Sequence, residues 1–202
     1  MLKKIAQSFS WTFHPLLMPT VGIFMLMYTD SYLSYIPGQA KNMIILLTGI
    51  GTLVLPLLMI PVFLLQGKIN NLQLDDRKER IYPMALSSIF YLLTFFLFSR
   101  IPVFKFLHAY ILGAFFSVFV ATLFSLKWKI SAHMIGLGGL TGLVAMASIK
   151  LNINLYYSLL GILIASGLTG ASRLYLEAHT PAQVYSGYLT GFLIMMLCLW
   201  VY

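Results

Sequence analysis

Residues 43–66 read MIILLTGIGTLVLPLLMIPVFLLQ, and none of these side chains carries a charge. A helix needs about 20 mostly apolar residues to cross the hydrocarbon core of a bilayer, so this run is long enough to span it. Six further runs are similar: 13–36, 81–99, 105–126, 131–149, 153–171 and 181–202. The pattern predicts an all-α fold, a polytopic transmembrane bundle of 6–7 helices that forms one domain over residues 1–202.

The composition of the chain agrees with this fold class. Of its 202 residues, 60% are hydrophobic and 9% are charged, whereas a soluble domain has about 45–50% apolar and about 25% charged residues. The net charge of +8 comes from 13 Lys and Arg against 5 Asp and Glu. In a soluble protein this excess would indicate nucleic-acid binding. Here the basic residues lie mostly in short loops, where they act as topology determinants, headgroup contacts or phosphate ligands, so we expect bilayer lipids and no nucleic acid as partners.

The N-terminal part of the chain is the least regular. Its first residues, MLKKIAQSFSWTFHPLL, lack an apolar core followed by a small-residue cleavage site, so we expect them to be retained. His14, Pro15 and Pro19 interrupt the run 13–36, and Asp30 lies near its end. These residues predict a broken or tilted first helix.

The most polar loops are predicted to share one side of the membrane. If all seven runs span, the loops after the second, fourth and sixth runs face the same way, namely 67–80, 127–130 and 172–180. Scattered basic and histidine side chains would then converge at one end of the bundle. Such convergence is what a single site between helices requires.

Small residues are concentrated in the last three runs. Gly138 and Gly142 are four residues apart, as are Gly187 and Gly191. In lipid, small residues allow helix backbones to approach closely. Together with the small face of the sixth run, they predict tight packing of the last three helices. That face consists of Gly161, Ala165, Gly167, Gly170 and Ala171.

The loop after the fourth run reads KWKISAHMIGLGG, residues 127–139. Ser131 is suited to cap the next helix, and His133 follows two residues later. A helix N-terminus presents free N–H groups that suit a phosphate. The alternative is that Ser131 only caps while His133 faces a neighbouring helix.

The loop after the sixth run, SRLYLEAHTPAQ, contains residues 172–183. Thr180, Pro181 and Gln183 have the spacing of a capping box with proline at the first helical position. The capping box explains neither Arg173 nor His179. Gln183 also follows His179 by four residues, so it can reach the imidazole if the helix begins earlier.

A third polar stretch, DDRKERIYP, covers residues 75–83. By itself it is typical of a solvated, mixed-charge loop before a helix, with Lys78 and Arg80 anchored at lipid headgroups.

Together these stretches resemble the type-2 phosphatidic acid phosphatase superfamily over roughly residues 75–191. That family has the motifs K-x6-R-P, P-S-G-H and S-R-x5-H-x3-D. The third motif is matched here by Ser172, Arg173 and His179, with Gln183 in place of Asp. The second is matched at Ser131 and His133, and of the first only Pro83 and the displaced Arg80 are present.

The resemblance implies a membrane lipid phosphatase or phosphotransferase that acts on a lipid phosphate or a prenyl pyrophosphate. His179 would attack phosphorus and form a phosphohistidine, His133 would protonate the leaving oxygen, and Gln183 would orient His179. No metal or other cofactor is implied. The implied phosphate-binding residues are Arg173, Arg80, Ser131 and Ser172, with Lys78 and Arg77 as further candidates.

Two alternatives remain open at this stage. Because Gln183 offers no countercharge to His179, the chain could be an inactive relative that binds or transports lipid. A metal-dependent transferase would instead use Asp75 and Asp76, although Mg²⁺ sites usually need several carboxylates. The sequence does not determine the lipid, the oligomeric state, or whether Glu177 takes the place of the missing Asp.

The expected location is a multi-pass position in a bacterial cytoplasmic membrane. The site side carries nine Lys and Arg and the other side four, which by the positive-inside rule puts the site in the cytoplasm. If the phosphate ligands are left out of the count, little bias remains, and bacterial members of the family commonly face outward. The side therefore stays open.

Overall fold

The computed structural model describes residues 2–29, 31–70 and 76–202, and the regular elements in these ranges are all helical. Six helical segments are long and apolar enough to cross a membrane. The predicted all-α transmembrane bundle is confirmed, and the chain is a multi-pass membrane protein. The six segments are Leu2–Tyr28, Gly38–Leu65, Arg77–Phe98, Lys105–Ser125, Ala132–Lys150 and Pro181–Val201.

The first segment is broken, as predicted, but its predicted ends are wrong. It consists of α1 (Leu2–Thr12), a 3₁₀ turn η1 (Pro15–Leu17) and α2 (Met18–Tyr28). The start at residue 13 is wrong because α1 is amphipathic: it carries Lys3 and Lys4 and buries only Ala6 and Ser10, one turn apart. After α2 the chain forms a short turn, η2 (Tyr32–Tyr35), and Asp30 lies outside the described residues.

The second segment is a chain of short helices. It runs through α3 (Gly38–Gly49), a π-helical turn η3 (Ile50–Val54), α4 (Leu55–Leu58) and α5 (Ile60–Leu65). Pro56 and Pro61 each stand near the start of one of the last two helices, where proline is tolerated because its missing N–H needs no partner.

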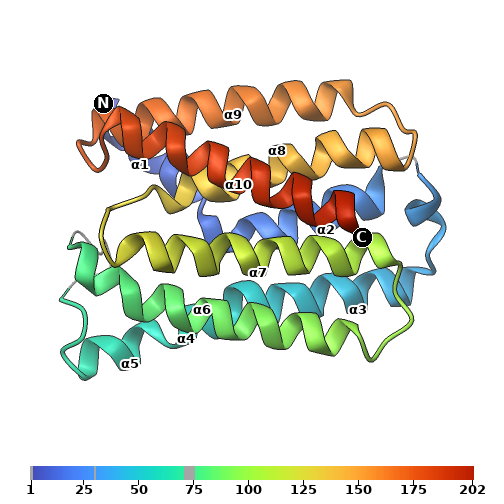
Figure 1. The fold of residues 1–202 in the computed structure, drawn as a ribbon, viewed down its shortest axis with the longest axis horizontal. Coiled ribbons are helices and arrows are strands. Elements are labelled where there is room, and N and C mark those ends of the chain that lie inside the picture. The colour runs from blue at the N-terminus through green and yellow to red at the C-terminus, as the bar shows by residue number, and fades with distance from the viewer. Residues whose placement is uncertain (1, 30, 71–75) are drawn as a thin grey trace.

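The remaining helices are long. They are α6 (Arg77–Phe98), α7 (Lys105–Ser125), α8 (Ala132–Lys150), α9 (Tyr156–Tyr175) and α10 (Pro181–Val201). Two predicted loops are shorter than expected, since α6 starts four residues before the run 81–99 and α9 ends four residues after the run 153–171. Ser172 and Arg173 therefore belong to the last turn of α9. This helix, which is not among the six spanning segments, lies along the outside of the bundle beside α8 and α1 (Figure 1).

Glycines determine how closely α8 and α10 pack. A Cβ atom at Gly138 would lie 2.1 Å from the Tyr188 carbonyl oxygen, and one at Gly191 would lie 2.0 Å from the Ile135 carbonyl oxygen. Only glycine allows this approach, so the predicted packing is confirmed for these two helices. The prediction of tight packing is wrong for much of α9, because a Cβ at Gly161 or Gly167 would meet no atom within 4 Å.

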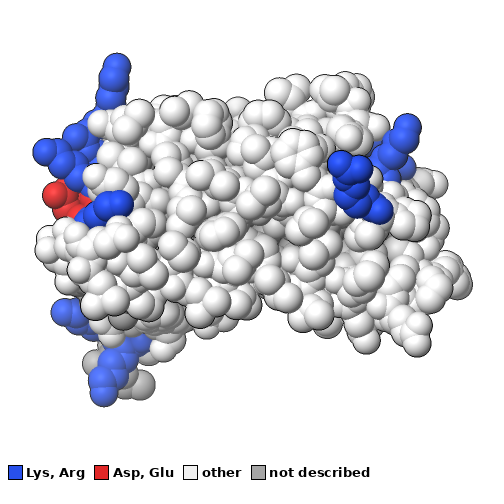
Figure 2. Space-filling model, turned by 90° about the horizontal axis from the view of Figure 1, so that it is seen from below, with Lys and Arg blue, Asp and Glu red and all other residues white. Residues whose placement is uncertain are grey.

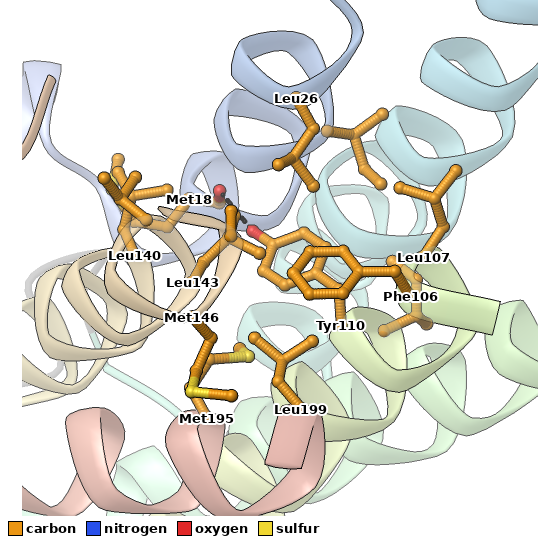
Figure 3. Packing of buried hydrophobic residues seen from close by; sticks show 14 of the residues in the cluster. Met18, Leu26, Phe106, Leu107, Tyr110, Leu140, Leu143, Met146, Met195 and Leu199 are labelled. Atoms are coloured by element: carbon orange, nitrogen blue, oxygen red, sulfur yellow. Dashed lines mark hydrogen bonds between the residues drawn. The ribbon is translucent and has the colours of Figure 1, made fainter. Parts of the chain in front are cut away.

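The core between the spanning helices contains one long-range hydrogen bond of note. Tyr110 on α7 donates its hydroxyl to the Met18 carbonyl, 3.0 Å away, at the start of α2. Figure 3 shows this bond among residues from α2, α7, α8 and α10. Gly22 makes room for it, because a Cβ there would lie 2.1 Å from the Tyr110 hydroxyl. The broken first segment is thereby fastened to the centre of the bundle.

The polar loops gather at one end of the molecule. In Figure 1 the end of α5 and the start of α6 lie at the end of the molecule where α1 begins, as do the connections α7–α8 and α9–α10, and the C-terminus lies at the other end. The predicted arrangement is confirmed for the described parts of the three loops, and residues 71–75 lie outside the described ranges. In Figure 2, Lys and Arg lie toward the two ends of the visible face, with a broad uncharged band between them that suits the bilayer interior.

Candidate functional site

The polar end of the bundle brings Arg80, His179 and Gln183 together. Arg80 Nη1 lies 3.4 Å from His179 Nε2, although the two residues are 99 positions apart. On the other side of the ring, His179 Nδ1 lies 3.1 Å from Gln183 Oε1. Arg80 and His179 are both buried, at 8% and 7% exposure. The histidine is therefore held between a cation and an amide at the edge of the membrane.

These contacts define which ring nitrogen of His179 carries the proton. Gln183 Oε1 also accepts the Thr180 backbone N–H at 3.2 Å, so the oxygen faces both donors. His179 must then donate through Nδ1–H. Arg80 has only donors, so Nε2 carries the lone pair and accepts from the guanidinium. The unprotonated nitrogen, which is the nucleophilic one, points toward the positive charge.

Two helix caps position His179 between α9 and α10. At the end of α9, the Glu177 and Ala178 N–H groups donate to the Leu174 and Arg173 carbonyls, which is the Schellman pattern. Glu177 takes the left-handed conformation that this pattern needs, with φ of 51°. Three residues after Glu177, the Thr180–Gln183 capping box starts α10. The predicted capping box is confirmed, and Gln183 serves both the cap and the imidazole.

Burial, together with the charges of Arg80, Arg173 and Lys129, lowers the pKa of His179 to about 3, although the hydrogen bond with Gln183 acts in the opposite direction. The ordinary value for histidine is 6.5. The ring is neutral at physiological pH as a result. A neutral imidazole has an unprotonated nitrogen that can act as a nucleophile, and the surrounding cations suit an anionic partner.

Arg80 lies on a different face of α6 from its neighbours in the sequence. The side chain of Asp76 caps α6 by accepting the Lys78 N–H at 3.1 Å. Lys78 is exposed and Arg77 is only partly buried, whereas Arg80 faces the interior. The expectation that 75–83 is a solvated loop is wrong from Arg77 onward, because these residues form the first turn of α6.

Ser10 of α1 contacts two of the predicted site residues. His133 Nε2 lies 3.1 Å from the Ser10 carbonyl oxygen and donates to it. Arg173 Nη1 donates to the Ser10 hydroxyl at 3.4 Å. His14 stacks edge-on against His133, with 5.7 Å between the ring centres. The pair His133 and Arg173 thus faces α1, next to the pair Arg80 and His179.

The two predicted serines differ in their surroundings. Ser131 precedes α8 as predicted, but its hydroxyl makes no capping bond. The residue is 0% exposed, and its Oγ has no hydrogen-bond partner in the described part of the chain. Its N–H donates to the Gln183 carbonyl at 3.3 Å, which joins α8 to α10. Ser172 donates its hydroxyl to Leu168 O in its own helix, 2.7 Å away, so the structure does not direct it toward His179.

Three residues near the site were missed as site residues by the sequence analysis. Lys129 lines an open depression of about 540 Å³ together with His179 and Gln183. Its position two residues before Ser131 was the available signal. Ser10 and His14 gave no such signal, because their contacts depend on how α1 packs against α9 and the start of α8.

Carboxylates play little part in the described site. Glu177 is exposed and lines the depression, and Asp76 caps α6, while Asp75 lies outside the described residues. Within the described ranges, no group of three or more His, Cys, Asp or Glu side chains is arranged to hold a metal ion.

Comparison of the chain with protein-family models, with curated proteins and with solved structures returned no match.

Proposed function

We propose that the chain is a membrane phosphatase or phosphotransferase that acts on a lipid phosphate or a prenyl pyrophosphate in a bacterial cytoplasmic membrane. The observation that supports this most directly is the buried contact of Arg80 with Nε2 of His179, whose Nδ1 is held by Gln183. A cation beside the nucleophilic nitrogen is close enough to move onto the phosphoryl oxygens, where positive charge stabilises the transition state of phosphoryl transfer.

In the proposed reaction, Arg80 leaves its contact with Nε2 of His179. It then binds the phosphoryl oxygens together with Arg173 and Lys129. Nε2 attacks phosphorus, a P–N bond forms, and the P–O bond to the lipid breaks. Gln183 holds the Nδ1 proton and stabilises the charged ring through its amide oxygen. Water then attacks the phosphohistidine and gives a proton to His133, the P–N bond breaks, phosphate is released, and His179 returns to its neutral form.

His133 is the proposed acid for the leaving oxygen. Its Nε2–H is engaged by the Ser10 carbonyl, so the transferred proton comes from Nδ1 of the protonated ring. The carbonyl keeps the ring in one orientation, as partners of catalytic histidines do. The products are a lipid alcohol, or a lipid monophosphate from a pyrophosphate, and inorganic phosphate.

The test is phosphate release by the purified protein in detergent with EDTA present. The substrates are phosphatidic acid, phosphatidylglycerol phosphate and a polyprenyl pyrophosphate. We expect turnover by wild type and loss of turnover in His179→Ala. The matched control is His108→Ala, since His108 contacts Phe98 O near the opposite end of α6 and lies away from the site. Turnover that persists in His179→Ala would refute the phosphohistidine mechanism.

A second candidate function is non-catalytic binding or transport of lipid. It is favoured by Gln183, whose amide gives His179 no countercharge. This candidate predicts phospholipid binding that survives His179→Ala, without phosphate release from any substrate. Turnover that appears only in Gln183→Asp would indicate an intact scaffold whose catalysis depends on that carboxylate.

A further inference from the structure

A cavity of about 90 Å³ lies inside the bundle, on the membrane side of the site. It is lined by residues of the η1–α2 segment, α6, α7 and α8, and by Met195 of α10. Figure 3 shows four of its lining residues, Met18, Tyr110, Leu140 and Met195, which converge from different helices. The cavity is thus surrounded by spanning helices and is distinct from the open depression at His179.

Small residues on two facing helices produce this cavity. Ala114, Ser117 and Ala121 line it from α7, and Gly136 and Gly139 line it from α8. The wall is almost entirely apolar, and apolar cavities of this size stay free of water. Ser117 Oγ is buried there without a hydrogen-bond partner in the part of the chain that the structure describes. The described side chains therefore leave this space unfilled.

The cavity continues the candidate site at helical spacing. On α6, Met84 lies one turn after Arg80, and Ser87 and Tyr91 follow on the same inner face. On α8, Ile135 and Gly139 follow Ser131 at intervals of four. Each helix thus presents a polar residue at the membrane edge and cavity-lining residues below it.

The length of the cavity suits an extended chain. Along α8 its wall runs from Ala132 to Leu140, which is about 12 Å at the rise of an α-helix. Its volume is smaller than that of an apolar cavity of roughly 150 Å³ that admits benzene. The space is therefore long and narrow, with mostly apolar walls, and its lining residue Met84 lies one helical turn after Arg80 on α6.

We propose that this cavity holds the first part of one hydrocarbon chain of a lipid whose phosphate lies between Arg80, His179 and Arg173. This inference rests on the proposed function and narrows its substrate class to lipids that can insert a single, slender chain, such as a single-chain alkyl or prenyl phosphate. A two-chain lipid would insert one chain and leave the other in the bilayer.

The test uses a substitution at Gly139 that narrows the cavity. A Cβ at Gly139 would meet Met195 Cε at 3.7 Å, an ordinary contact, so a larger side chain can start there and extend into the cavity. Gly139→Leu should reduce phosphate release from a long-chain alkyl phosphate at least about tenfold and leave p-nitrophenyl phosphate within about twofold. Gly139→Ala should give a smaller effect in the same direction. Gly167→Leu is the matched control, because a Cβ there meets no atom within 4 Å.

A photoreactive alkyl phosphate with a diazirine in mid-chain gives a readout that needs no turnover. In vesicles of phosphatidylcholine, we expect it to label α7 and α8 peptides in wild type and in Gly167→Leu, and much less in Gly139→Leu. Labelling confined to the outer helix faces would overturn the proposal. The proposal would also be overturned if a monodisperse Gly139→Leu protein lost phosphate release from the long-chain alkyl phosphate and from p-nitrophenyl phosphate to the same extent.

The two proposals fail in different ways. If wild type is labelled in the cavity but releases no phosphate from any substrate, the chain site stands and the phosphatase function fails. If phosphate is released but neither label nor substrate preference responds to Gly139→Leu, the function stands and the chain site fails.

Discussion

Arg80 and His179 meet across 99 positions of sequence, with 3.4 Å between the guanidinium Nη1 and the imidazole Nε2. Each comes from the edge of a different helix, Arg80 from the first turn of α6 and His179 from the connection before α10. The contact places a permanent cation at the unprotonated nitrogen of a neutral histidine.

Replacement of Arg80 should directly weaken the binding and transfer of the phosphoryl group. A hydrogen bond to a charged group contributes about 1.5–3 kcal/mol, so Arg80→Ala should lower kcat/KM by roughly 10- to 100-fold. Arg80→Lys should recover only part of the loss, because a lysine lacks the planar fork. Lys78→Ala is the control on the same helix, since Lys78 is exposed. Equal losses in Arg80→Ala and Lys78→Ala would mean that general surface charge, and not the contact with His179, matters.

The low pKa of His179 predicts a specific pH dependence of stability. Its pKa is about 3 when folded, against an ordinary value of 6.5, so the unfolded state binds more protons between these values. Stability should be unaffected by this group above about pH 6.5 and should fall as the pH drops from there toward about 3. His179→Gln should therefore show a smaller drop in Tm between pH 7 and pH 5 than wild type. Identical drops in the two proteins would contradict the low pKa.

Gln183 can be exchanged for Glu without loss of the helix cap, because both residues complete a capping box. Gln183→Glu would place a carboxylate next to His179 Nδ1, which lies 3.1 Å from the amide oxygen in wild type. The negative charge should raise the pKa of His179 and stabilise its charged form. We expect kcat to rise and the acidic limb of the pH–rate profile to move to higher pH. Gln183→Ala should lower both stability and rate, with about 1 kcal/mol lost from the cap.

Ser10 should compete with phosphate for Arg173. Ser10→Ala removes the 3.4 Å contact between the serine hydroxyl and Arg173 Nη1. Arg173 then no longer has to give up this contact when it binds an anion. Affinity for inorganic phosphate should increase roughly five-fold, which corresponds to a hydrogen bond of about 1 kcal/mol. Ser8→Ala is the matched control, because Ser8 is an exposed serine of the same helix whose hydroxyl donates to Lys4 O. A loss of affinity in Ser10→Ala would instead assign Ser10 a positioning role for Arg173.

Glu177 lies in the left-handed region at φ of 51°, at the end of α9. A residue with a Cβ is strained there by about 1–2 kcal/mol relative to glycine. Glu177→Gly should therefore raise the thermal stability of the protein, while Glu177→Gln should leave it unchanged. Phosphate release should be unaffected by either change, and a loss in both would show that the Glu177 carboxylate supports His179.

Much of the bundle could be predicted from local patterns. Runs of about 20 apolar residues predict spanning helices because the bilayer leaves backbone polar groups no partner except the helix itself. The capping box before α10 and the glycine spacing of α8 and α10 act over one or two turns, so they too could be predicted. The boundaries were less accurate, since α1 alternates polar and apolar faces and both α6 and α9 extend into charged residues.

The sequence by itself determined an all-helical membrane bundle whose polar loops lie at one end, because both features depend on hydropathy and on counting helices along the chain. Tertiary structure alone decided which polar side chains meet. Arg80 and Lys78 are equally charged and two residues apart, yet only Arg80 reaches His179, because packing sets which face of α6 turns inward. The same holds for Ser10, whose contacts with His133 and Arg173 depend on the packing of α1 against α9.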